Sequence, residues 1–478
     1  MSGEELADLS AVELVGLFAA GEAGPVEAVQ ACLTRIDRLD PELNAVRTLL
    51  AESALASAAD SAGRWARGEA RALEGVPFAL KDIISTAGVP TSGGSGLYVD
   101  WVPAETAAHA QRLQDAGAVL LAKLNTFEFA GGGAYSRHFG AVHNPWDLRR
   151  TTGGSSTGSG AAVAGRLVPL AVGTDTGGSV RVPAAYCGIT GLKPTNGRVP
   201  RHGVMGLSWT LDHVGPMTRT AEDAALALGV MAGFDPRDAG SSPRPVPDYL
   251  AALSAGVSGQ QVGRVRGYVE EALHPGVRAA YESAMADLAG LGVEVVDVEI
   301  PGIAEARTAG WLVCYAETLS LHREHLPTIE DRDEMIAVTY AAGPFVSAAD
   351  YLQALRYRPV FQRSIEAALT GCAALVLPTT DTVAPLLRDT TAATSIAATG
   401  PGGEADWMAD VTRNNMPFSY AGVPGLSVPC GFADGMPVGM QLLGRPHDDA
   451  AVLRLAAHYQ AATSHHLVRP AVLDTVPA

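Results

Sequence analysis

Two clusters of glycine and serine flank a strand-like run, and this arrangement most restricts what the chain can fold into. The first cluster covers residues 151–160 (TTGGSSTGSG) and the second covers residues 173–184 (GTDTGGSVRVPA). Residues 167–172 between them are apolar and typical of a buried strand. A flexible loop would not contain a core strand between its two halves, so the clusters indicate a functional site.

The composition indicates a globular protein. The chain has 478 residues, of which 47% are hydrophobic and 6% aromatic. Its net charge of −17 argues against a surface that binds nucleic acid, since phosphate contacts need a basic patch. Five scattered cysteines without a CxxC pair favour free thiols in a reducing compartment. An acidic N-terminus and the lack of a long apolar run predict a cytoplasmic chain without a membrane span.

Helix-like and strand-like segments alternate along the chain, which favours an α/β layered fold. The expected helices cover residues 5–20, 25–39, 48–70, 105–117, 221–232, 277–290, 448–462 and much of 303–370. The expected strands cover residues 76–81, 119–122, 167–172, 293–298, 373–377, 426–429 and 438–443. We expect one domain over residues 1–478, with a helical N-terminal arm (1–70), a mostly helical insertion (235–370) and a mobile loop at 388–406.

Two specific interpretations of the clusters fit poorly. A phosphate-binding loop needs Gly-x-x-x-x-Gly-Lys-Ser/Thr, or Gly-x-Gly-x-x-Gly after a strand, and neither cluster has that spacing. Residues 154–158 do match the Gly-x-Ser-x-Gly motif of α/β-hydrolases, with Ser156 at the centre. That motif needs a strand immediately before it, whereas residues 144–150 contain a proline and charged side chains.

The chain resembles the amidase signature family of serine hydrolases. The resemblance rests on Lys81, Ser155 and Ser179 and on residues 124–131 (LNTFEFAG), 144–147 (NPWD), 183–188 (PAAYCG), 191–195 (GLKPT), 212–220 (DHVGPMTRT) and 422–429 (GVPGLSVP). It covers residues 75–450 densely, and Thr157 departs from it where many members have glycine. It implies a twisted mixed β-sheet covered by helices on both faces, a Ser–cis-Ser–Lys triad, and no metal or other cofactor.

The resemblance assigns Ser179 as the nucleophile, Ser155 as the bridging cis-serine and Lys81 as the base. A serine hydroxyl is a poor nucleophile and needs a base within hydrogen-bond distance. A lysine can be that base only when it is neutral, and burial in the apolar run 76–84 would lower its pKa.

Supporting roles follow for residues near the two serines and on one upstream segment. Backbone N–H groups free of bulky side chains suit an oxyanion hole, and the candidates are Thr176, Gly177, Gly178 and Ser179. Side chains expected to hold the site in place are Asp175, Arg181 and Ser156. Residues expected to line the substrate pocket are Gly131, Gly132 and Phe127.

Other candidates are weaker. His322 and His325 are three residues apart and could share one face of a helix, but no third ligand is evident, so we expect no metal site. Asp212 and His213 are expected to be structural. The aromatic residues fit core packing better than pocket walls, and these are Phe127, Trp209, Tyr315, Phe345 and Tyr420.

These observations favour a metal-independent amidase that acts on linear amides through an acyl-enzyme, with anilides, carbamates (urethanes) and esters chemically close. A small-molecule amide or carbamate is the expected partner, with no nucleic acid and no membrane, and a homodimer is left open.

Two alternatives remain. The first is the glutamine amidotransferase subunit of a tRNA-dependent transamidase, which resembles this chain. There, an acidic residue a dozen positions before the final Val-Pro holds the glutamine amine. Thr412 occupies that position, Asp410 is two positions away, and Ser419 replaces a common asparagine. The second alternative is a non-catalytic scaffold, which the intact Lys81, Ser155 and Ser179 disfavour.

Overall fold

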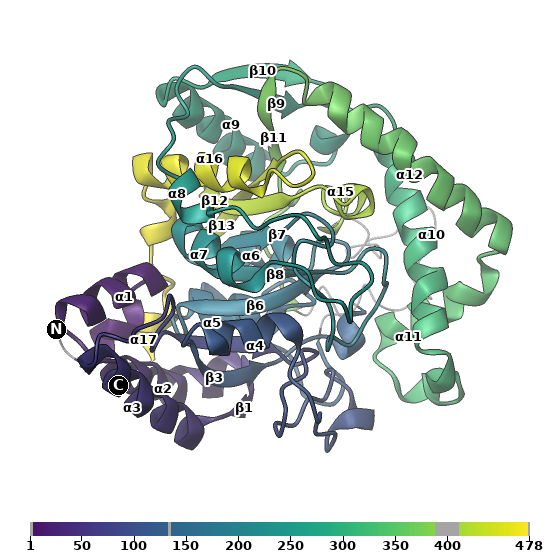
Figure 1. The fold of residues 1–478 in the computed structure, drawn as a ribbon. Coiled ribbons are helices and arrows are strands. Elements are labelled where there is room, and N and C mark those ends of the chain that lie inside the picture. The colour runs from purple at the N-terminus through teal and green to yellow at the C-terminus, as the bar shows by residue number, and fades with distance from the viewer. Residues whose placement is uncertain (1–2, 132–134, 388–410, 477–478) are drawn as a thin grey trace.

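The computed structural model describes residues 3–131, 135–387 and 411–476, and a mixed sheet of eleven strands runs through its centre (Figure 1). The strands lie in the order β1-β3-β2-β6-β8-β7-β12-β13-β11-β9-β10. Their bounds are Val46–Leu49 (β1), Pro77–Lys81 (β2), Val119–Leu124 (β3), Leu170–Asp175 (β6), Thr190–Lys193 (β7), His213–Thr218 (β8), Gln261–Val265 (β9), Glu294–Val298 (β10), Cys372–Pro378 (β11), Gly425–Ala433 (β12) and Met436–Leu443 (β13). A separate short pair consists of His143–Asn144 (β4) and Asp147–Thr151 (β5).

Helices surround the sheet (Figure 1). The helices used below are Ala11–Ala20 (α1), Pro25–Leu43 (α2), Ala51–Ala66 (α3), Ala108–Asp115 (α4), Thr157–Ala164 (α5), Arg181–Cys187 (α6), Ala221–Met231 (α7), Pro275–Gly290 (α9), Ile303–Leu321 (α10), Glu334–Ala342 (α11), Ala348–Ala368 (α12), Met416–Ala421 (α15), Asp449–Ala462 (α16) and Val472–Thr475 (α17). None of the described helices is both long and apolar enough to cross a bilayer.

Side chains of the central strands alternate between two hydrophobic cores, one on each face of the sheet. On β2, Phe78 and Leu80 belong to one core while Ala79 belongs to the other. On β6, Leu170 and Val172 lie in the first core and Ala171 in the second. This period of two is what a strand with two buried faces requires. The predicted α/β class, with helices on both faces of a mixed sheet, is confirmed.

The sheet brings Lys81 and the second glycine and serine cluster to the same side. β2 runs parallel to β6, with Leu80 opposite Val172, so both strands end on the same side. Lys81 is the last residue of β2, and residues 173–175 are the last of β6. The second glycine and serine cluster therefore begins beside Lys81.

The start of the N-terminal arm differs from its prediction. Residues 5–20 are not one helix, because a short 3₁₀ helix (Gly3–Asp8) ends before Ser10, which caps α1 in a capping box with Glu13. The arm is closed by the other end of the chain, since the Arg38 guanidinium on α2 donates to the Leu473 and Val476 carbonyl oxygens at 3.3 and 2.9 Å.

Residues 235–370 do more than add helices. They supply β9 and β10, the last two strands of the sheet, as well as α10 and α12, which stand at one side of the molecule (Figure 1). The loop expected at 388–406 lies outside the described residues.

Candidate active site

Lys81 is fully buried and contacts two hydroxyl groups. Its Nζ lies 2.7 Å from Ser155 Oγ and 2.8 Å from Thr174 Oγ1 on the neighbouring strand β6. Burial lowers the pKa of Lys81 to about 7, and the nearby Asp212 and Asp175 carboxylates oppose that shift. A substantial fraction of Lys81 is therefore neutral near pH 7 and able to accept a proton.

Ser155 follows a glycine in a tight turn between β5 and α5. The Gly154–Ser155 peptide bond is cis. The Ser155 carbonyl accepts hydrogen bonds from Thr126 Oγ1 (3.0 Å) and from the Phe127 N–H (3.3 Å). A Cβ atom at Gly154 would lie only 2.1 Å from the Phe127 ring, so the turn needs glycine here. Phe127 thus packs under Gly154 and is not one of the residues that line the pocket beside Ser179.

Ser179 lies on the loop between β6 and α6 and is partly exposed. Its carbonyl accepts the Ser156 N–H at 3.3 Å, which joins the two clusters. The Asp175 carboxylate accepts the Gly178 N–H at 2.8 Å and the Val180 N–H at 3.2 Å, on either side of Ser179. The loop is therefore fixed from within by the side chain that begins it.

The same bond corrects the predicted oxyanion hole. The Gly178 N–H already donates to Asp175, which removes Gly178 from the set of expected donors. The N–H groups of Thr176, Gly177 and Ser179 have no acceptor among the residues that the structure describes. Three of the four predicted donors thus remain available to a ligand.

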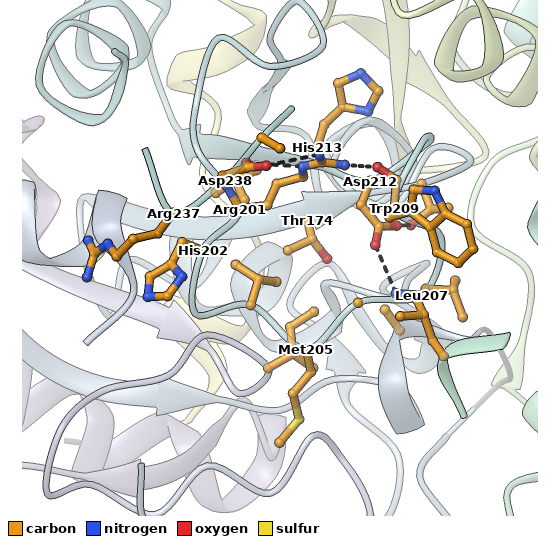
Figure 2. A pocket seen from close by; sticks show the side chains of 18 residues that line it. Thr174, Arg201, His202, Met205, Leu207, Trp209, Asp212, His213, Arg237 and Asp238 are labelled. Atoms are coloured by element: carbon orange, nitrogen blue, oxygen red, sulfur yellow. Dashed lines mark hydrogen bonds and ion pairs between the residues drawn. The ribbon is translucent and has the colours of Figure 1, made fainter. Parts of the chain in front are cut away.

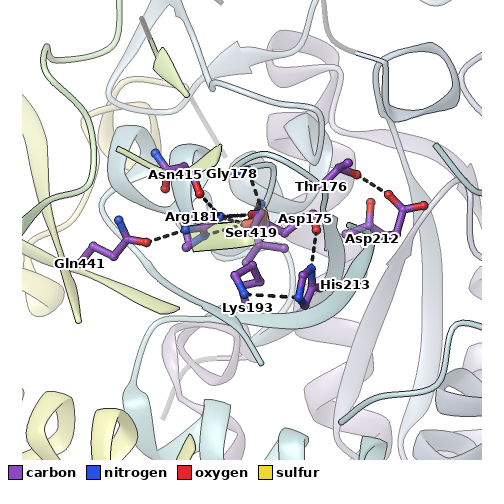
Figure 3. A network of polar contacts seen from close by, with 12 residues as sticks. Asp175, Thr176, Gly178, Arg181, Lys193, Asp212, His213, Asn415, Ser419 and Gln441 are labelled. Atoms are coloured by element: carbon purple, nitrogen blue, oxygen red, sulfur yellow. Dashed lines mark hydrogen bonds and ion pairs between the residues drawn. The ribbon is translucent and has the colours of Figure 1, made fainter. Parts of the chain in front are cut away.

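Arg181 is the centre of a fully buried polar network (Figure 3). Its guanidinium pairs with the Asp175 carboxylate at 2.8 and 2.9 Å and donates to Gln441 Oε1 and Ser419 Oγ, each at 2.6 Å. Ser419 in turn donates to Asp175 at 3.0 Å. Burial alone would raise the pKa of Asp175, but the Arg181 charge outweighs it and holds that pKa well below its ordinary value. The network ties the Ser179 loop to α15 and β13.

Ser156 is buried and occupied by backbone contacts. Its hydroxyl donates to the Thr174 carbonyl and accepts the Thr174 N–H, both at 3.2 Å. β5 ends at Thr151, so no strand runs directly into Ser156 as a nucleophile elbow requires. The geometry therefore does not support the α/β-hydrolase interpretation.

Two residues near the site had no predicted catalytic role. Thr174 contacts Lys81 directly, and Asp212 accepts hydrogen bonds from Thr176 Oγ1 (2.5 Å) and from the N–H groups of Leu207 and Ser208 (2.8 and 3.0 Å). Thr174 lies inside the second cluster, but its sequence position gives no sign that it faces the lysine. Only the pairing of β2 with β6 brings the two side chains together.

Ser179 opens into a small pocket of about 30 Å³. Its described lining has no charged side chain and consists of Ala130, Gly131, Gly154, Thr176, Gly177, Ser179, Leu207, Trp311, Cys314, Thr339, Thr412 and Met416. Gly131 thus lies where it was predicted, and Gly132 lies outside the described residues. The far wall comes from α10, α11 and α15.

The remaining candidates lie elsewhere or have other contacts. His322 Nε2 donates to the Gly206 carbonyl (2.8 Å), and His325 contacts the Tyr98 hydroxyl (3.0 Å). No group of three or more His, Cys, Asp or Glu side chains in the described part of the chain could hold a metal ion. Tyr420 is buried, whereas Phe345 is 88% exposed, so neither lines the pocket.

Comparison with known proteins gives the family. The family model described as Amidase matches residues 27–453. A glutamyl-tRNA(Gln) amidotransferase subunit from Chloroflexus aggregans is 40% identical, over 95% of this chain and 96% of that protein. The peptide amidase of Stenotrophomonas maltophilia has a TM-score of 0.83 at 31% identity, covering 98% of this chain and 99% of that one.

A structure described as a vestigial protein complex that reveals the origins of an s-triazine catabolic enzyme is also similar. It has a TM-score of 0.87 at 33% identity, covering 95% of this chain and 98% of that one. The relatives therefore include a protein named as a peptide amidase and proteins named as subunits of an amidotransferase. Among the two functions expected from the sequence, the curated names favour the amidotransferase subunit over the general amidase.

The expectation that nucleic acid has no part must be corrected. The curated relatives are named as subunits that act on glutamyl-tRNA(Gln). Net charge concerns only direct phosphate contacts by this chain's own surface, and it does not test work within an assembly. The family match over most of the chain, together with the geometry of Lys81, Ser155 and Ser179, establishes that this chain belongs to the amidase family.

Proposed function

We propose that the chain cleaves the C–N bond of a carboxamide by forming an acyl-enzyme on Ser179. The observation that carries this proposal is the 2.7 Å hydrogen bond between Ser155 Oγ and the buried Lys81, whose pKa is about 7. A neutral amine in contact with one serine hydroxyl, with a second serine on the adjoining loop, is a base positioned for proton relay.

The reaction then takes two steps. In the first, Ser179 Oγ bonds to the carbonyl carbon while its proton passes through Ser155 to Lys81. The oxyanion accepts hydrogen bonds from the N–H groups of Thr176, Gly177 and Ser179. The C–N bond breaks as the proton returns through Ser155 to the leaving nitrogen. In the second step, water attacks the ester carbonyl and gives its proton along the same path. The proton then returns through Ser155 to Ser179 Oγ as the ester C–O bond breaks and the acid leaves. Carbamates and esters can follow the same course.

Glutamine is the first candidate for the amide donor. The relatives named as amidotransferase subunits match nearly the whole chain at 38–40% identity, which supports a role in supplying ammonia to a tRNA-bound acceptor. In that case the chain would work with a partner protein, as the word subunit in those names implies.

An uncharged amide is the second candidate, and the pocket supports it. Glutamine carries an ammonium and a carboxylate, and burying either without a counter-charge is costly. No described residue of the Ser179 pocket is charged, and Thr412, at the position where an acid would hold the amine, is one of its lining residues.

One experiment tests the chemistry and then the donor. A small sulfonyl fluoride should label Ser179 in the purified chain, as mapped by peptide mass spectrometry, and Ser156→Ala should be labelled as the unmodified protein is. Labelling on Ser156, or none at all, would overturn the acyl-enzyme. The kcat/KM values for glutamine, an aryl anilide and a carbamate, measured with and without candidate partner proteins and tRNA, then decide between the donors.

A further inference from the structure

Two cavities meet behind the nucleophile loop. The small pocket beside Ser179 shares Ala130, Thr176 and Leu207 with a second cavity of about 270 Å³ (Figure 2). We call this second cavity the Thr174 chamber, because Thr174 lines it and does not line the first pocket. The first pocket encloses only about 30 Å³ on the same measure, so the two differ greatly in size.

The two cavities adjoin different catalytic groups. Ser179 and Gly177, which carry the nucleophile and one oxyanion donor, line the small pocket. Thr174 lines the chamber, and its hydroxyl is 2.8 Å from Lys81 Nζ. The chamber therefore lies on the side of the base, whereas the small pocket lies on the side of the nucleophile.

Amide cleavage requires the acyl half of the substrate to lie at Ser179 and the amine half to lie toward the base. The acyl carbon must bond to Ser179 Oγ, so the acyl group occupies the small pocket. The leaving nitrogen must collect its proton from the Ser155 and Lys81 relay, so the amine lies toward the base. A substituent on that nitrogen then points to the Thr174 chamber.

The lining of the chamber indicates what kind of substituent fits. Its lining has an aliphatic part, made of Ile83, Val204, Met205, Leu207 and Leu321, and a polar part that includes Arg201, His202, Asp212, His213, Arg237 and Asp238. The carboxylate of Asp212 already accepts three hydrogen bonds.

The cations of the chamber are also paired. Arg201 contacts Asp238 at 3.2 Å, and Arg237 contacts Asp235 at 2.8 Å. An anionic ligand would therefore find no unpaired arginine here and would face the Asp212 carboxylate, whereas an apolar group would bury surface against the aliphatic part of the lining.

We infer that the Thr174 chamber binds the amine half of the substrate, and that the preferred substrates join a compact acyl group to a bulky, uncharged, apolar amine such as an arylamine. This inference rests on the proposed acyl-enzyme at Ser179. Glutamine has the opposite shape, a long acyl group on ammonia, and would leave the chamber without a substituent.

The test compares leaving groups on one acyl group. Acetanilide and acetamide share the acetyl group. The third compound, 2-phenylacetamide (called phenylacetamide below), carries its ring on the acyl side. The wild-type kcat/KM should be higher for acetanilide than for phenylacetamide. Met205→Trp and, independently, Val204→Phe fill the chamber and should lower the ratio of kcat/KM for acetanilide to that for acetamide at least tenfold. Leu352→Trp adds the same indole to an exposed site on α12 and should leave the ratio unchanged.

A second measurement needs no turnover. Calorimetric titration with 1-naphthylamine should show binding to the wild-type chain and loss of binding in both filled variants. Binding that survives both fillings, or a loss of phenylacetamide rather than acetanilide turnover, would overturn the inference. Failure of the sulfonyl fluoride to label Ser179 would instead reject the proposed acyl-enzyme, while the titration would still decide whether the chamber binds an arylamine.

Discussion

The loop that carries Ser179 and the wall that faces it are built in different ways. The loop is tied to the sheet by buried ionic and backbone bonds, with Asp175 and Arg181 both fully buried. The facing wall consists of single side chains from α10, α11 and α15, such as Trp311, Thr339 and Met416, around a pocket without charge. The comparison suggests that the chemistry depends on the sheet, whereas substrate choice depends on the wall.

The largest expected effect comes from the loop. Ser179→Ala should lower kcat/KM by about 10⁴-fold or more, because no other group can form the acyl-enzyme. The free energy of unfolding should change little, since the side chain is partly exposed. Progress curves with the best amide and urea denaturation measure the two effects. Ser156→Ala is the neighbouring control, and activity that survives in Ser179→Ala and disappears in Ser156→Ala would reverse the assignment.

The pH profile should show the base directly. Burial lowers the pKa of Lys81 to about 7, so the neutral, active form is lost as pH falls through that value. Activity should be half-maximal near pH 7, level off about one pH unit above and fall about tenfold for each pH unit well below. Lys81→Met should abolish turnover, and EDTA should not affect the wild-type chain. An acid limb that disappears after dialysis against EDTA and returns with zinc would contradict a lysine base.

Breaking the buried network around Arg181 should lower the free energy of unfolding. Arg181→Met leaves the Asp175 carboxylate buried without its partner and should cost about 3–5 kcal/mol of unfolding free energy. Arg149→Ala removes an exposed arginine that pairs with Asp147 at 2.9 Å and should change the unfolding free energy far less, because solvent screens an exposed pair. Urea titrations of both variants make the comparison. Equal losses would show that the network is not what holds the Ser179 loop.

Substitutions in the wall that faces Ser179 should change substrate affinity without changing the rate of the chemical step. The buried Trp311 Nε1–H lines the pocket and has no hydrogen-bond partner among the described residues, so a bound substrate can accept from it. Trp311→Phe removes this donor, worth about 1 kcal/mol, and should raise KM about fivefold at nearly constant kcat. Trp311→Leu separates the loss of the donor from the loss of the ring. A fall in kcat with unchanged KM would place Trp311 among the groups that act in the transition state.

The smallest effect is expected at Phe345, which lies just before α12. Phe345 is 88% exposed, so Phe345→Ser should change the unfolding free energy by less than about 0.5 kcal/mol and leave kcat/KM as it was. A large loss in either quantity would show that this surface is covered by another molecule in solution.

Site residues could be predicted better where they share a short segment than where the fold brings distant segments together. The glycines and serines of each cluster share a short segment, so Ser155, Ser179 and the flanking Asp175 could be predicted as a group. Lys81 required the resemblance to the family, because a lysine after a short strand has no special pattern of its own. The contact of Thr174 with Lys81 could not be predicted, since it depends on β2 and β6 being neighbours in the sheet.

The fold shows the same limit. Apolar runs predicted β2, β3, β6, β12 and β13, because strands buried on both faces have continuous hydrophobic sequences. They did not predict β7, β8 or β9, whose short sequences are interrupted by glycine, proline or polar residues. The helix expected over 48–70 overlaps the edge strand β1 at Thr48 and Leu49, since the residues of this strand are only partly covered and do not alternate clearly. The break before Ser10 was also missed, although the serine and Glu13 are a capping-box pair that could have revealed it.

The bonds from Arg38 to the carbonyl oxygens of Leu473 and Val476 have a consequence for synthesis of the chain. The second helix leaves the ribosome long before the carbonyl groups that complete its contacts. At roughly 5–20 residues per second, the 435 positions that separate Arg38 from Leu473 take about 20 to 90 seconds to emerge. Throughout that time the helix lacks this partner, so a segment that is made early is finished late.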